Sequence, residues 1–451
     1  MHIGLFGLGV VGSAVYEILQ HNAAIIRSQT RVDVVVRRVC VRDPDKARTV
    51  ALPAGLLTTD PRAILDDPEI EVVVEVMGGL SPAREYMLQA LQRGKSVITA
   101  NKEVIADHGP ELFEMAENAG ADLLFEASVG GGIPILRPLA ETLAAGRIRR
   151  VLGIINGTTN YILSQMSQTG AAFATALAEA KARGYAEADP TADVEGHDAA
   201  RKLAILAAIA FHAKVNTAFV RTEGITRIGP ADIAYGRERG WVVKLIALAQ
   251  ARAGEIEARV QPCFLPAAHP LAGVSDAFNA IYIYGDEVGE TMFYGRGAGG
   301  LPTASAVIGD IVAAVRNRRV GVSFSENRFH RPLRPISPEA VSARYCLRLA
   351  LDPLALPARR RRSLGAAAPW PESGLAEHLP GEGSAGVEQA CAACGVPVHR
   401  LTLVPGSGDK ELVLETGRSN EANVAHLKDL LQDVPGVRTI MGTIRILTDA
   451  D

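Results

Sequence analysis

Acidic residues gather around one lysine between Gly184 and Lys202. Five carboxylates precede the lysine in this segment: Glu187, Asp189, Asp193, Glu195 and Asp198. An apolar, helix-like run from Leu203 to Ala210 follows it, which places the cation at the edge of a core. A lysine held beside carboxylates can give or take a proton at a reacting oxygen. The segment therefore predicts the working end of an enzyme.

The spacing inside this segment predicts a helix with charged side chains on one face. Asp198 and Lys202 stand four residues apart with the acid first, which is the favourable order for an ion pair along a helix. Asp193 is the expected N-cap and Glu195 the acid of the first turn, where carboxylates suit the helix dipole. A surface ion pair also fits the spacing, so the prediction rests on the five acids and the apolar flank.

A glycine motif near the amino terminus predicts where a dinucleotide binds. Gly7-Leu-Gly9-Val-Val-Gly12 stands between a strand-like run, residues 3–6, and a helical pattern that begins at Ser13. In this G-x-G-x-x-G arrangement two glycines allow a tight turn against a pyrophosphate, and the third lets the helix pack on the strand. We assign five residues of the turn to cofactor contact: Gly7, Gly9, Val10, Val11 and Gly12. A glycine turn that serves packing alone is the alternative.

The end of the next strand-like run, residues 32–41, selects between the two nicotinamide cofactors. A base at this position accepts the 2′-phosphate of NADP, whereas an acid binds the ribose hydroxyls of NAD. Arg42 and Lys46 favour NADP, and Asp43 leaves NAD open. We assign Arg42 to cofactor contact, with a solvated loop as the alternative.

Three more buried runs predict further strands of a parallel sheet: residues 71–77, 96–99 and 123–128. Ser81 is the expected cap of a helix whose first residue is Pro82. Lys102 follows the strand at 96–99, at the carboxyl end where such sheets bind ligands. We expect it to contact nicotinamide or substrate, although an ordinary loop lysine fits equally well.

Two further glycine-rich turns offer close approach to a ligand. The first, Val129 to Pro134, follows Glu126, and its backbone carbonyls suit a hard cation, although a simple bend needs the same glycines. The second contains Gly297 and precedes a helix expected over Thr303–Arg316, so we assign Gly297 to the cofactor. This helix is expected to return and pack against the first domain.

A polar turn opens the middle of the chain. Asn156-Gly-Thr-Thr-Asn160 follows a predicted strand and carries four groups able to bind a ligand, Thr158 among them. Strand-like and helix-like runs then alternate, as in an α+β domain. The fold class predicted is α/β in three domains: a Rossmann dinucleotide-binding domain at 1–145 with 297–325 returning to it, an α+β catalytic and dimerisation domain at 146–296, a linker at 326–343, and a small α+β domain at 344–451.

Composition limits the class of protein. The 451 residues are 48% hydrophobic and 22% charged with a net charge of −3, which gives no reason to expect nucleic acid or an anionic membrane as partner. Five cysteines do not form a disulfide framework and favour a reducing cytoplasm. The start lacks a leader pattern, and no uninterrupted apolar run reaches membrane-spanning length. We predict a cytoplasmic protein that acts on a small molecule.

Six segments together resemble the homoserine dehydrogenases, in that family's order. They are the Gly7 turn, Glu75–Gly79, Thr99–Lys102, Gly153–Asn160, Gly184–Lys202 and Gly295–Ser305, within residues 1–325. The resemblance implies reversible conversion of L-homoserine and NAD(P)+ into L-aspartate 4-semialdehyde and NAD(P)H, in threonine, methionine and isoleucine biosynthesis. It also implies a homodimer or homotetramer.

The same resemblance implies roles for single residues. Lys202 is then the proton donor and acceptor at the reacting oxygen, and Lys102 a second catalytic or cofactor-contacting lysine. Glu187 binds the substrate amino group, supported by three residues of the site: Asp193, Asp198 and Thr158. A monovalent cation, Na+ or K+, is expected at Glu126 with the backbone oxygens of Val129, Gly131 and Ile133.

Residues 344–448 resemble the regulatory ACT domain that many of these enzymes carry. The family's helix-opening sequence is replaced by Asp352-Pro-Leu-Ala-Leu-Pro-Ala-Arg359-Arg-Arg-Arg362, and a Pro/Gly/Ala-rich insertion follows to about residue 386. We therefore expect an altered effector loop, with the arginine run facing solvent rather than an acidic partner. Cys391 and Cys394 have the spacing of a redox or metal pair, but buried or idle thiols are favoured because no second pair exists.

Two other functions compete with this prediction. An aldehyde-oxidising enzyme such as aspartate-semialdehyde dehydrogenase needs a nucleophilic cysteine, and none of the five stands in an active-site turn. A nucleotide-sensing regulatory protein would keep the fold without the chemistry, and Lys102 and Lys202 argue against it.

Overall fold

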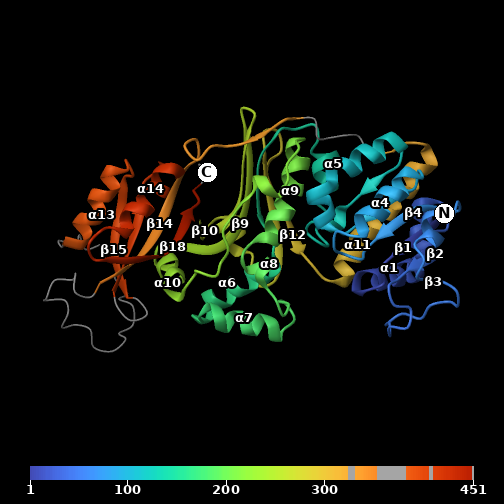
Figure 1. Ribbon diagram of the computed structural model, residues 1–451, viewed down its shortest axis with the longest axis horizontal. Helices are drawn as coiled ribbons and strands as arrows, with labels where there is room; N and C mark the ends of the chain where they lie inside the picture. Colours follow the sequence, from blue (N-terminus) through green and yellow to red (C-terminus); the bar gives the residue numbers. More distant parts are fainter. Residues whose placement is uncertain (324–330, 353–381, 406–409, 449–451) are drawn as a thin grey trace.

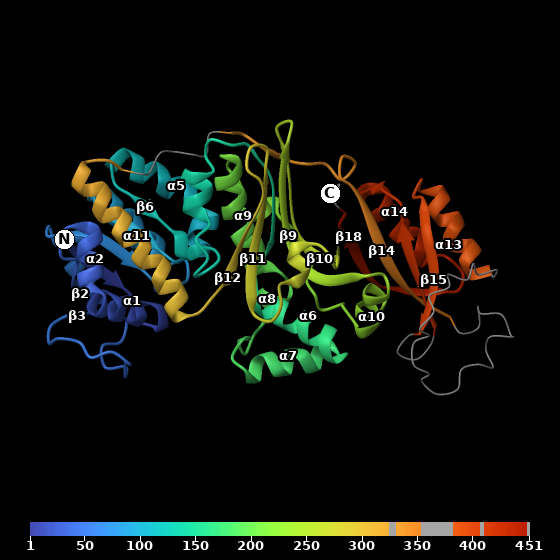
Figure 2. The same cartoon turned by 180° about the vertical axis from the view of Figure 1, so that it is seen from behind.

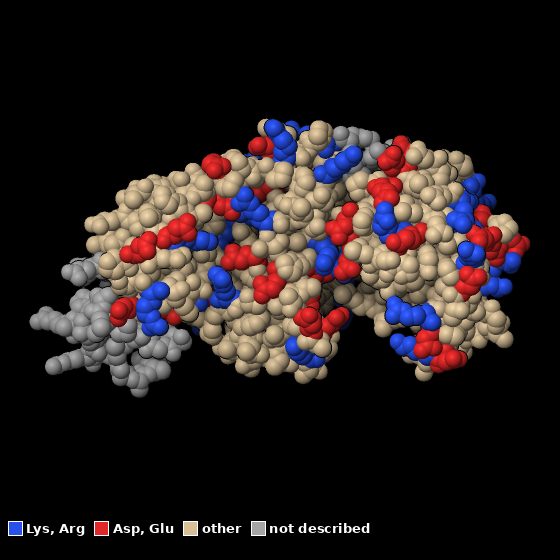
Figure 3. Space-filling view, viewed as in Figure 1, with Lys and Arg blue, Asp and Glu red and all other residues tan. Residues whose placement is uncertain are grey.

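The computed structural model describes residues 1–323, 331–352, 382–405 and 410–448. Its elements form three units in a row, with the amino-terminal sheet at one end and the carboxyl-terminal elements at the other (Figure 1). The Arg359–Arg362 run and most of the predicted insertion lie outside the described residues. Lysine, arginine and acidic side chains are interspersed over the face drawn in Figure 3. Among the described residues, no helix is both long and apolar enough to cross a bilayer.

The amino-terminal domain is built on a six-stranded sheet in which every neighbouring pair is parallel. The strand order is β3-β2-β1-β4-β5-β6, which is that of a doubly wound dinucleotide-binding sheet. The strands are β1 His2–Phe6, β2 Val35–Cys40, β3 Leu57–Thr58, β4 Ile70–Glu75, β5 Ser96–Thr99 and β6 Leu123–Leu124. The predicted Rossmann fold is therefore confirmed.

Helices cover this sheet on both faces, as its apolar strands require. They are α1 Val10–His21, α2 Ala23–Thr30, α3 Arg62–Leu65, α4 Ala83–Gln92, α5 Lys102–Ala119 and the later α11 Gly300–Val320. Helix α11 lies beside α1 and α2 although nearly the whole middle of the chain separates them (Figure 2). Its Ala304 and Val307 share one buried cluster with Val15 and Leu19 of α1.

The middle domain is a sheet with strand order β12-β11-β7-β9-β10. Its strands are β7 Ile148–Ile154, β8 Arg221–Thr222 (paired to β10), β9 Trp241–Arg252, β10 Glu255–Pro266, β11 Phe278–Gly285 and β12 Gly289–Arg296. Its helices are α6 Gly157–Thr169, α7 Phe173–Ala182, α8 Thr191–Val194, α9 His197–Phe211 and α10 Pro230–Glu238. Helices α6 and α9 pack directly on the strands, so the residues at their amino-terminal ends are fixed relative to the sheet.

The carboxyl-terminal domain follows the order strand, helix, strand, strand, helix, strand. Its elements are β14 Ser342–Leu351, α13 Glu382–Ala393, β15 Val398–Pro405, β16 Lys410–Thr416, α14 Glu421–Gln432 and β18 Val437–Ile446, with the short strands β13 Arg334–Pro335 and β17 Ser419–Asn420. The sheet order is β18-β14-β16-β15. This is the split β-α-β arrangement expected of the ACT-like fold.

The middle and carboxyl-terminal sheets are continuous, because β18 pairs with β10 at Cys263–Arg445 and Phe264–Ile446. Buried ion pairs reinforce the junction. The Arg348 guanidinium lies 2.8 Å from Asp232 of α10 and 2.6 Å from Glu411 of β16. The two domains therefore meet through hydrogen-bonded backbone and compensated charge rather than through a loose tether.

Several local predictions need correction. Helix α4 begins at Ala83, with Pro82 rather than Ser81 preceding it and no side-chain cap. The backbone closes this turn instead, because Arg84 N–H donates to the carbonyl of Leu80. Glu126 lies in a short 3-10 turn, Glu126–Ser128, and not in a strand, because β6 ends at Leu124.

The buried junction makes a stability prediction. Arg348→Ala should lower the free energy of unfolding by about 3–5 kcal/mol, because Asp232 and Glu411 would stay buried without a counter-charge. Arg221→Ala is the control, since the Arg221 side chain is 48% exposed in its pair with Glu421 and should contribute no more than about 1 kcal/mol. Urea unfolding followed by circular dichroism measures both; equal losses would contradict the prediction.

Candidate active site

A cavity of about 300 Å³ lies between the amino-terminal and middle domains. Its walls come from the first turn of α1, from the loops after β4, β5 and β6, from the turn that leads into α11 and from the second turn of α9. The residues that line it are Val11, Val76, Met77, Gly78, Ala100, Asn101, Lys102, Ala127, Ser128, Gly130, Gly131, Lys202, Gly297, Ala298 and Thr303. Both predicted lysines thus reach one cavity, together with the predicted contacts Val11, Gly131 and Gly297.

One carboxylate lies between the two lysines. Asp198 Oδ2 accepts a hydrogen bond of 2.7 Å from Lys202 Nζ, and Asp198 Oδ1 is 3.4 Å from Lys102 Nζ. The first contact confirms the helical ion pair that the four-residue spacing predicts. The second joins residues almost a hundred positions apart, which no local pattern indicates.

Lys202 is held by fixed acceptors and is nearly buried. Its side chain is 11% exposed, and its ammonium group also donates to the carbonyl of Ile155 at 2.9 Å. An ammonium group has three donors, and Asp198 and Ile155 take two of them. The third N–H has no acceptor among the described residues and remains for a ligand in the cavity.

Asn156 joins the polar turn to the acidic segment. Its Nδ2 donates to Asp193 Oδ1 at 2.7 Å and to Asp198 Oδ2 at 2.9 Å, while its Oδ1 accepts from Thr159 N–H and caps α6. The side chain is 4% exposed. Asn156 therefore sets the orientation of both carboxylates, a role that the sequence prediction did not assign to it.

The prediction that Asp193 caps the lysine-bearing helix is wrong. Asp193 lies in the separate helix α8, and α9 begins at His197 after Gly196. Gly196 has φ = 82°, a left-handed conformation that glycine adopts readily, and its N–H donates to the carbonyl of Asp193. This turn moves Glu195 out of the helix and makes Asp198 the acid of the first turn.

The surroundings shift the pKa values of the two aspartates in opposite directions. Burial by itself raises the pKa of Asp198, but the charges of Lys202 and Lys102 outweigh it and leave the pKa at about 2. Burial raises the pKa of Asp193, and the neighbouring charge of Asp198 adds to the rise. Asp198 is therefore the permanent anion of the site, whereas Asp193 binds a proton more readily.

The first glycine turn fits a dinucleotide. A Cβ on Gly7, where φ is 98°, would meet the carbonyl oxygen of Val76 at 2.8 Å, and one on Gly12 would clash with the carbonyl oxygen of Gly7. A Cβ on Gly9 would meet no protein atom within 4 Å. Glycine is thus needed at 7 and 12 for the chain's own packing, while Gly9 leaves open space at the start of α1. The helix has no side-chain cap there, so its N–H groups suit a phosphate.

Three other predicted residues, Glu187, Thr158 and Arg42, do not line the cavity. Glu187 is exposed between α7 and α8 and makes no hydrogen bond or ion pair within the described ranges. Thr158 Oγ1 donates to the carbonyl of Tyr185 at 2.6 Å. Arg42 is exposed just after β2, whose last carbonyl, from Cys40, accepts from Gly7 N–H at 3.0 Å.

The predicted cation loop is shaped by Glu126. Its carboxylate accepts backbone N–H groups from Ile135, Leu136 and Arg137, the last two at 2.8 and 2.7 Å. Its oxygens are thus already used to close the turn after the glycines. No group of three His, Cys, Asp or Glu side chains is arranged for a metal within the part of the chain that is described, so a cation in this loop would depend on carbonyl oxygens.

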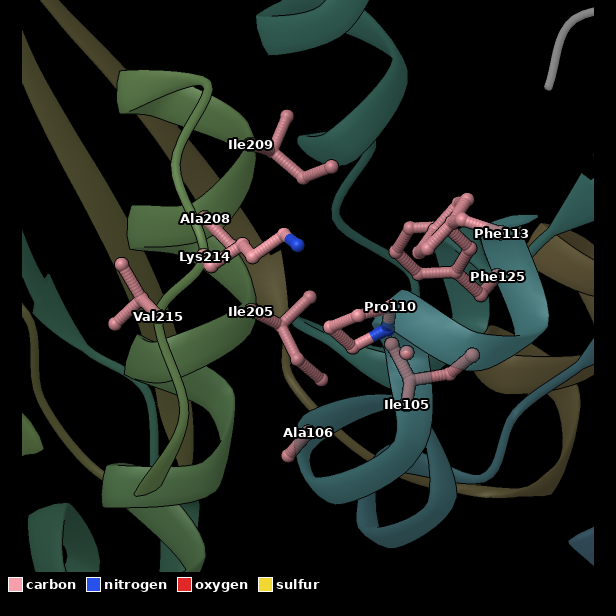
Figure 4. Close-up of a pocket in the computed structure, with 11 residues that line it drawn as sticks. Ile105, Ala106, Pro110, Phe113, Phe125, Ile205, Ala208, Ile209, Lys214 and Val215 are labelled. Carbon is pink, nitrogen blue, oxygen red and sulfur yellow. The ribbon is translucent and has the colours of Figure 1, made fainter. Parts of the chain in front are cut away.

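Apolar packing holds the two lysine-bearing helices together beyond the cavity. Ile105 and Phe113 of α5 and Ile205 and Ile209 of α9 face one another around a small pocket of about 20 Å³ (Figure 4). The ammonium groups lie at the start of α5 and in the second turn of α9. Their separation is therefore fixed by the packing of these helices.

Comparison with known proteins assigns the family. Family models described as homoserine dehydrogenase and as its NAD binding domain match residues 134–312 and 7–126. A homoserine dehydrogenase of Bacillus subtilis is 39% identical over 99% of this chain and 98% of its own. The chain belongs to the homoserine dehydrogenase family. A crystal structure of a homoserine dehydrogenase from Thiobacillus denitrificans, 37% identical, superposes with a TM-score of 0.87 over 99% of this chain and 98% of that one.

A second structure bears on the cofactor of this homoserine dehydrogenase family. A hyperthermophilic archaeal member, described in complex with NADPH, is 29% identical and has a TM-score of 0.58 over 69% of this chain and 97% of its own. Together with the matched NAD binding domain, it supports a nicotinamide cofactor. The chain is therefore an NAD(P)-dependent oxidoreductase that acts on a small-molecule substrate.

The five cysteines argue against the alternative function, that of an aldehyde-oxidising dehydrogenase. All five are buried, and none lines the cavity. Burial raises the pKa of the Cys391 thiol to about 12 and also raises that of Cys394. These two thiols are buried, which agrees with the prediction that they are not a reactive pair.

The stability that the two lysine charges give to ionised Asp198 can be measured by unfolding the protein at different pH values. A carboxyl whose folded pKa is depressed stabilises the fold above its unfolded pKa and loses this contribution as pH falls through the folded value. The wild-type chain should exceed Asp198→Asn in free energy of unfolding by about 2 kcal/mol above roughly pH 4. The difference should shrink as pH falls toward about 2. Urea unfolding at stepped pH measures it, and a difference that stays constant with pH would contradict the prediction.

Proposed function

We propose that the chain interconverts L-homoserine and L-aspartate 4-semialdehyde with Lys202 as the group that moves the proton. The observation that carries this proposal is the pair of ammonium groups, Lys102 and Lys202, that share Asp198 at the carboxyl edge of a dinucleotide-binding sheet. When bound, the nicotinamide supplies or accepts a hydride at the substrate carbon. The chain then has to bind the substrate and control the proton on its oxygen.

Lys202 is assigned to that oxygen because one of its N–H groups is left for a ligand. In the reducing direction its ammonium stabilises the developing alkoxide and donates the proton; in the oxidising direction its amine accepts one. Asp198 keeps the ammonium in place through the 2.7 Å hydrogen bond. Lys102 is the second catalytic or cofactor-contacting lysine.

Glu187 is assigned to the α-ammonium group of the substrate. Its carboxylate is exposed and makes no ion pair among the described residues, so it is available to a cationic group. Asp193 and Thr158 support it: both lie on the Asn156 side of the site, where Asp193 is bonded to Asn156 and Thr158 to the carbonyl of Tyr185.

NADP is the proposed cofactor in preference to NAD. Arg42 is exposed at the end of β2, next to the Gly7 turn, where a base suits a 2′-phosphate. The measurement is kcat/KM with each cofactor and saturating homoserine. A higher value with NAD+ would reject this assignment.

A monovalent cation is proposed in the loop between Val129 and Ile133. The carbonyl oxygens of Val129, Gly131 and Ile133 accept no backbone hydrogen bond from the described residues, and Glu126 fixes the turn that follows. Oxygen donors of this kind suit a hard cation. Replacing Na+ and K+ by tetramethylammonium at constant ionic strength should lower turnover, and an unchanged rate would argue against the site.

A homodimer or homotetramer through the middle sheet is proposed as the assembly, in a reducing cytoplasm that suits five buried thiols. Strand β12 ends the sheet order, and its Met292 and Tyr294 are 41% and 54% exposed. A sheet edge with exposed apolar side chains invites a partner. Sedimentation that gave a monomer at assay concentration would overturn this part.

The domain division is also proposed: 1–145 with 297–325, 146–296, a linker at 326–343 and 344–451. Two buried clusters support the outer domains, since α11 shares one with α1 and β14, α13 and α14 share another, while a third cluster runs through all three domains. The ACT-like arrangement supports a regulatory role for the last domain. The predicted alteration of its effector loop falls mostly outside the described residues.

Lys202→Ala is the decisive variant for the mechanism. Turnover of homoserine should fall by about 10²–10⁴-fold, the range that a general acid–base contributes, while the Kd for NADPH stays unchanged. Lys214→Ala is the matched control, because Lys214 lies beyond α9 at the apolar pocket and outside the cavity. Spectrophotometric assay and fluorescence titration measure the two quantities. Near-normal turnover by Lys202→Ala would contradict the proposed mechanism. A wild type that did not reduce NADP+ or NAD+ with homoserine would contradict the proposed function.

A further inference from the structure

Glu75 is a buried carboxyl group that the proposed mechanism does not use. It is the last residue of β4, is 0% exposed, and stands in register with Thr99, the last residue of β5. The preceding residues of β4, Val72 to Val74, are also completely buried. An acid in this position is costly unless hydrogen bonds compensate it. Its partners therefore indicate what it is for.

The two oxygens of Glu75 bind two different loops. Oε1 accepts N–H from Met77 at 2.8 Å and from Gly78 at 3.3 Å, in the loop after β4. Oε2 accepts a hydrogen bond of 2.6 Å from the hydroxyl of Thr99, at the end of β5 where the next loop begins. No lysine, arginine or histidine forms an ion pair with it in the described structure. The carboxyl group thus acts as a two-sided clamp for neutral donors.

The bonds continue from the clamp toward Lys102. Thr99 Oγ1 accepts Asn101 N–H at 2.9 Å, and Asn101 Nδ2 donates to the carbonyl of Gly79 at 2.7 Å, which closes a ring between the loops. Asn101 Oδ1 then caps α5 by accepting Val104 N–H. Lys102 is the first residue of that helix, so the ring fixes where its side chain starts.

The same loops form the cofactor side of the cavity. Val76, Met77 and Gly78 line it from one loop, and Ala100, Asn101 and Lys102 from the other. The carbonyl oxygen of Val76 also lies against Gly7, where a Cβ would approach it to 2.8 Å. Gly78 and Gly79 both have φ = 76°, so their turn depends on glycine and directs the Gly78 N–H back to Glu75. A shift of the turn at Gly78 and Gly79 would therefore also displace the glycine turn at Gly7.

We propose that Glu75 is a positioning residue for the reaction, which joins the loops after β4 and β5 and thereby sets the nicotinamide site and Lys102 relative to Lys202. This inference rests on the proposed function, because it takes the cavity as the cofactor site. A positioning role differs from a role in stability alone, because the loops after β4 and β5 contact the cavity. The substrate-side residues of α6 and α8 do not depend on these loops.

Glu75→Ala separates these roles by kinetics. The KM for NADP+ should rise about tenfold and kcat should fall about 10- to 100-fold, the cost of a misplaced reacting group, while the KM for homoserine changes less than about twofold. Glu75→Gln should restore most of the loss, because its amide can still accept from Met77 and face Thr99. Thr99→Val cuts one link and should give a smaller rise in the KM for NADP+, which keeps the test open if Glu75→Ala does not fold.

Glu415→Ala is the matched control. Glu415 is also 0% exposed and accepts from Tyr235 and Arg239, but it lies in the carboxyl-terminal sheet. It should lower Tm without raising the KM for NADP+. If Glu75→Ala, or Thr99→Val in its place, lowered Tm and left both kinetic constants of the cofactor unchanged, the inference would be overturned. Failure of the wild type to bind NADPH would overturn the proposed function instead.

Discussion

The candidate active site depends on one carboxylate shared by two ammonium groups. Lys102 and Lys202 enter one cavity from different domains, and two like charges so close would repel unless an anion lay between them. Asp198 is that anion, at 2.7 Å from one nitrogen and 3.4 Å from the other. The compensation works only if the starts of α5 and α9 meet. The architecture can therefore be understood as the means of bringing two helix termini from separate sheets together.

Each sheet contributes in its own way to that meeting. The parallel sheet presents its carboxyl edge, where the glycine turn, the Glu75 clamp and the loop before α5 are adjacent. Helix α9 packs on the middle sheet. Its Lys202 is therefore held in place and donates a hydrogen bond to the carbonyl of Ile155, just after β7. Helix α11 fastens the two, because it leaves the middle sheet after β12 and packs in the core of the first domain.

Local features of the site could be predicted from the sequence, and long-range ones could not. The glycine turn and the Asp198–Lys202 spacing depend on neighbours, so their patterns indicated the right structure. The prediction for Asp193 was wrong because α9 begins only after Gly196, about one turn later than a helix capped by Asp193 would begin. The sequence predicts no positioning role for Glu75 or Asn156, because their partners Thr99, Asp193 and Asp198 lie on other strands and helices. An acid that directly follows three buried valines in a strand was the available signal for Glu75.

The long strand β10 has a continuous partner strand on one side and three short ones on the other. One side pairs with β9 along its whole length, whereas the other side is covered in three pieces, by β13 at Glu255 and Ile256, by β8 at Arg259 and Val260, and by β18 at Cys263 and Phe264. Strand β18 thus covers part of the edge of the middle sheet. Deleting the carboxyl-terminal domain would not yield a smaller enzyme with an intact middle; it would uncover a hydrogen-bonding edge of the kind that templates aggregation.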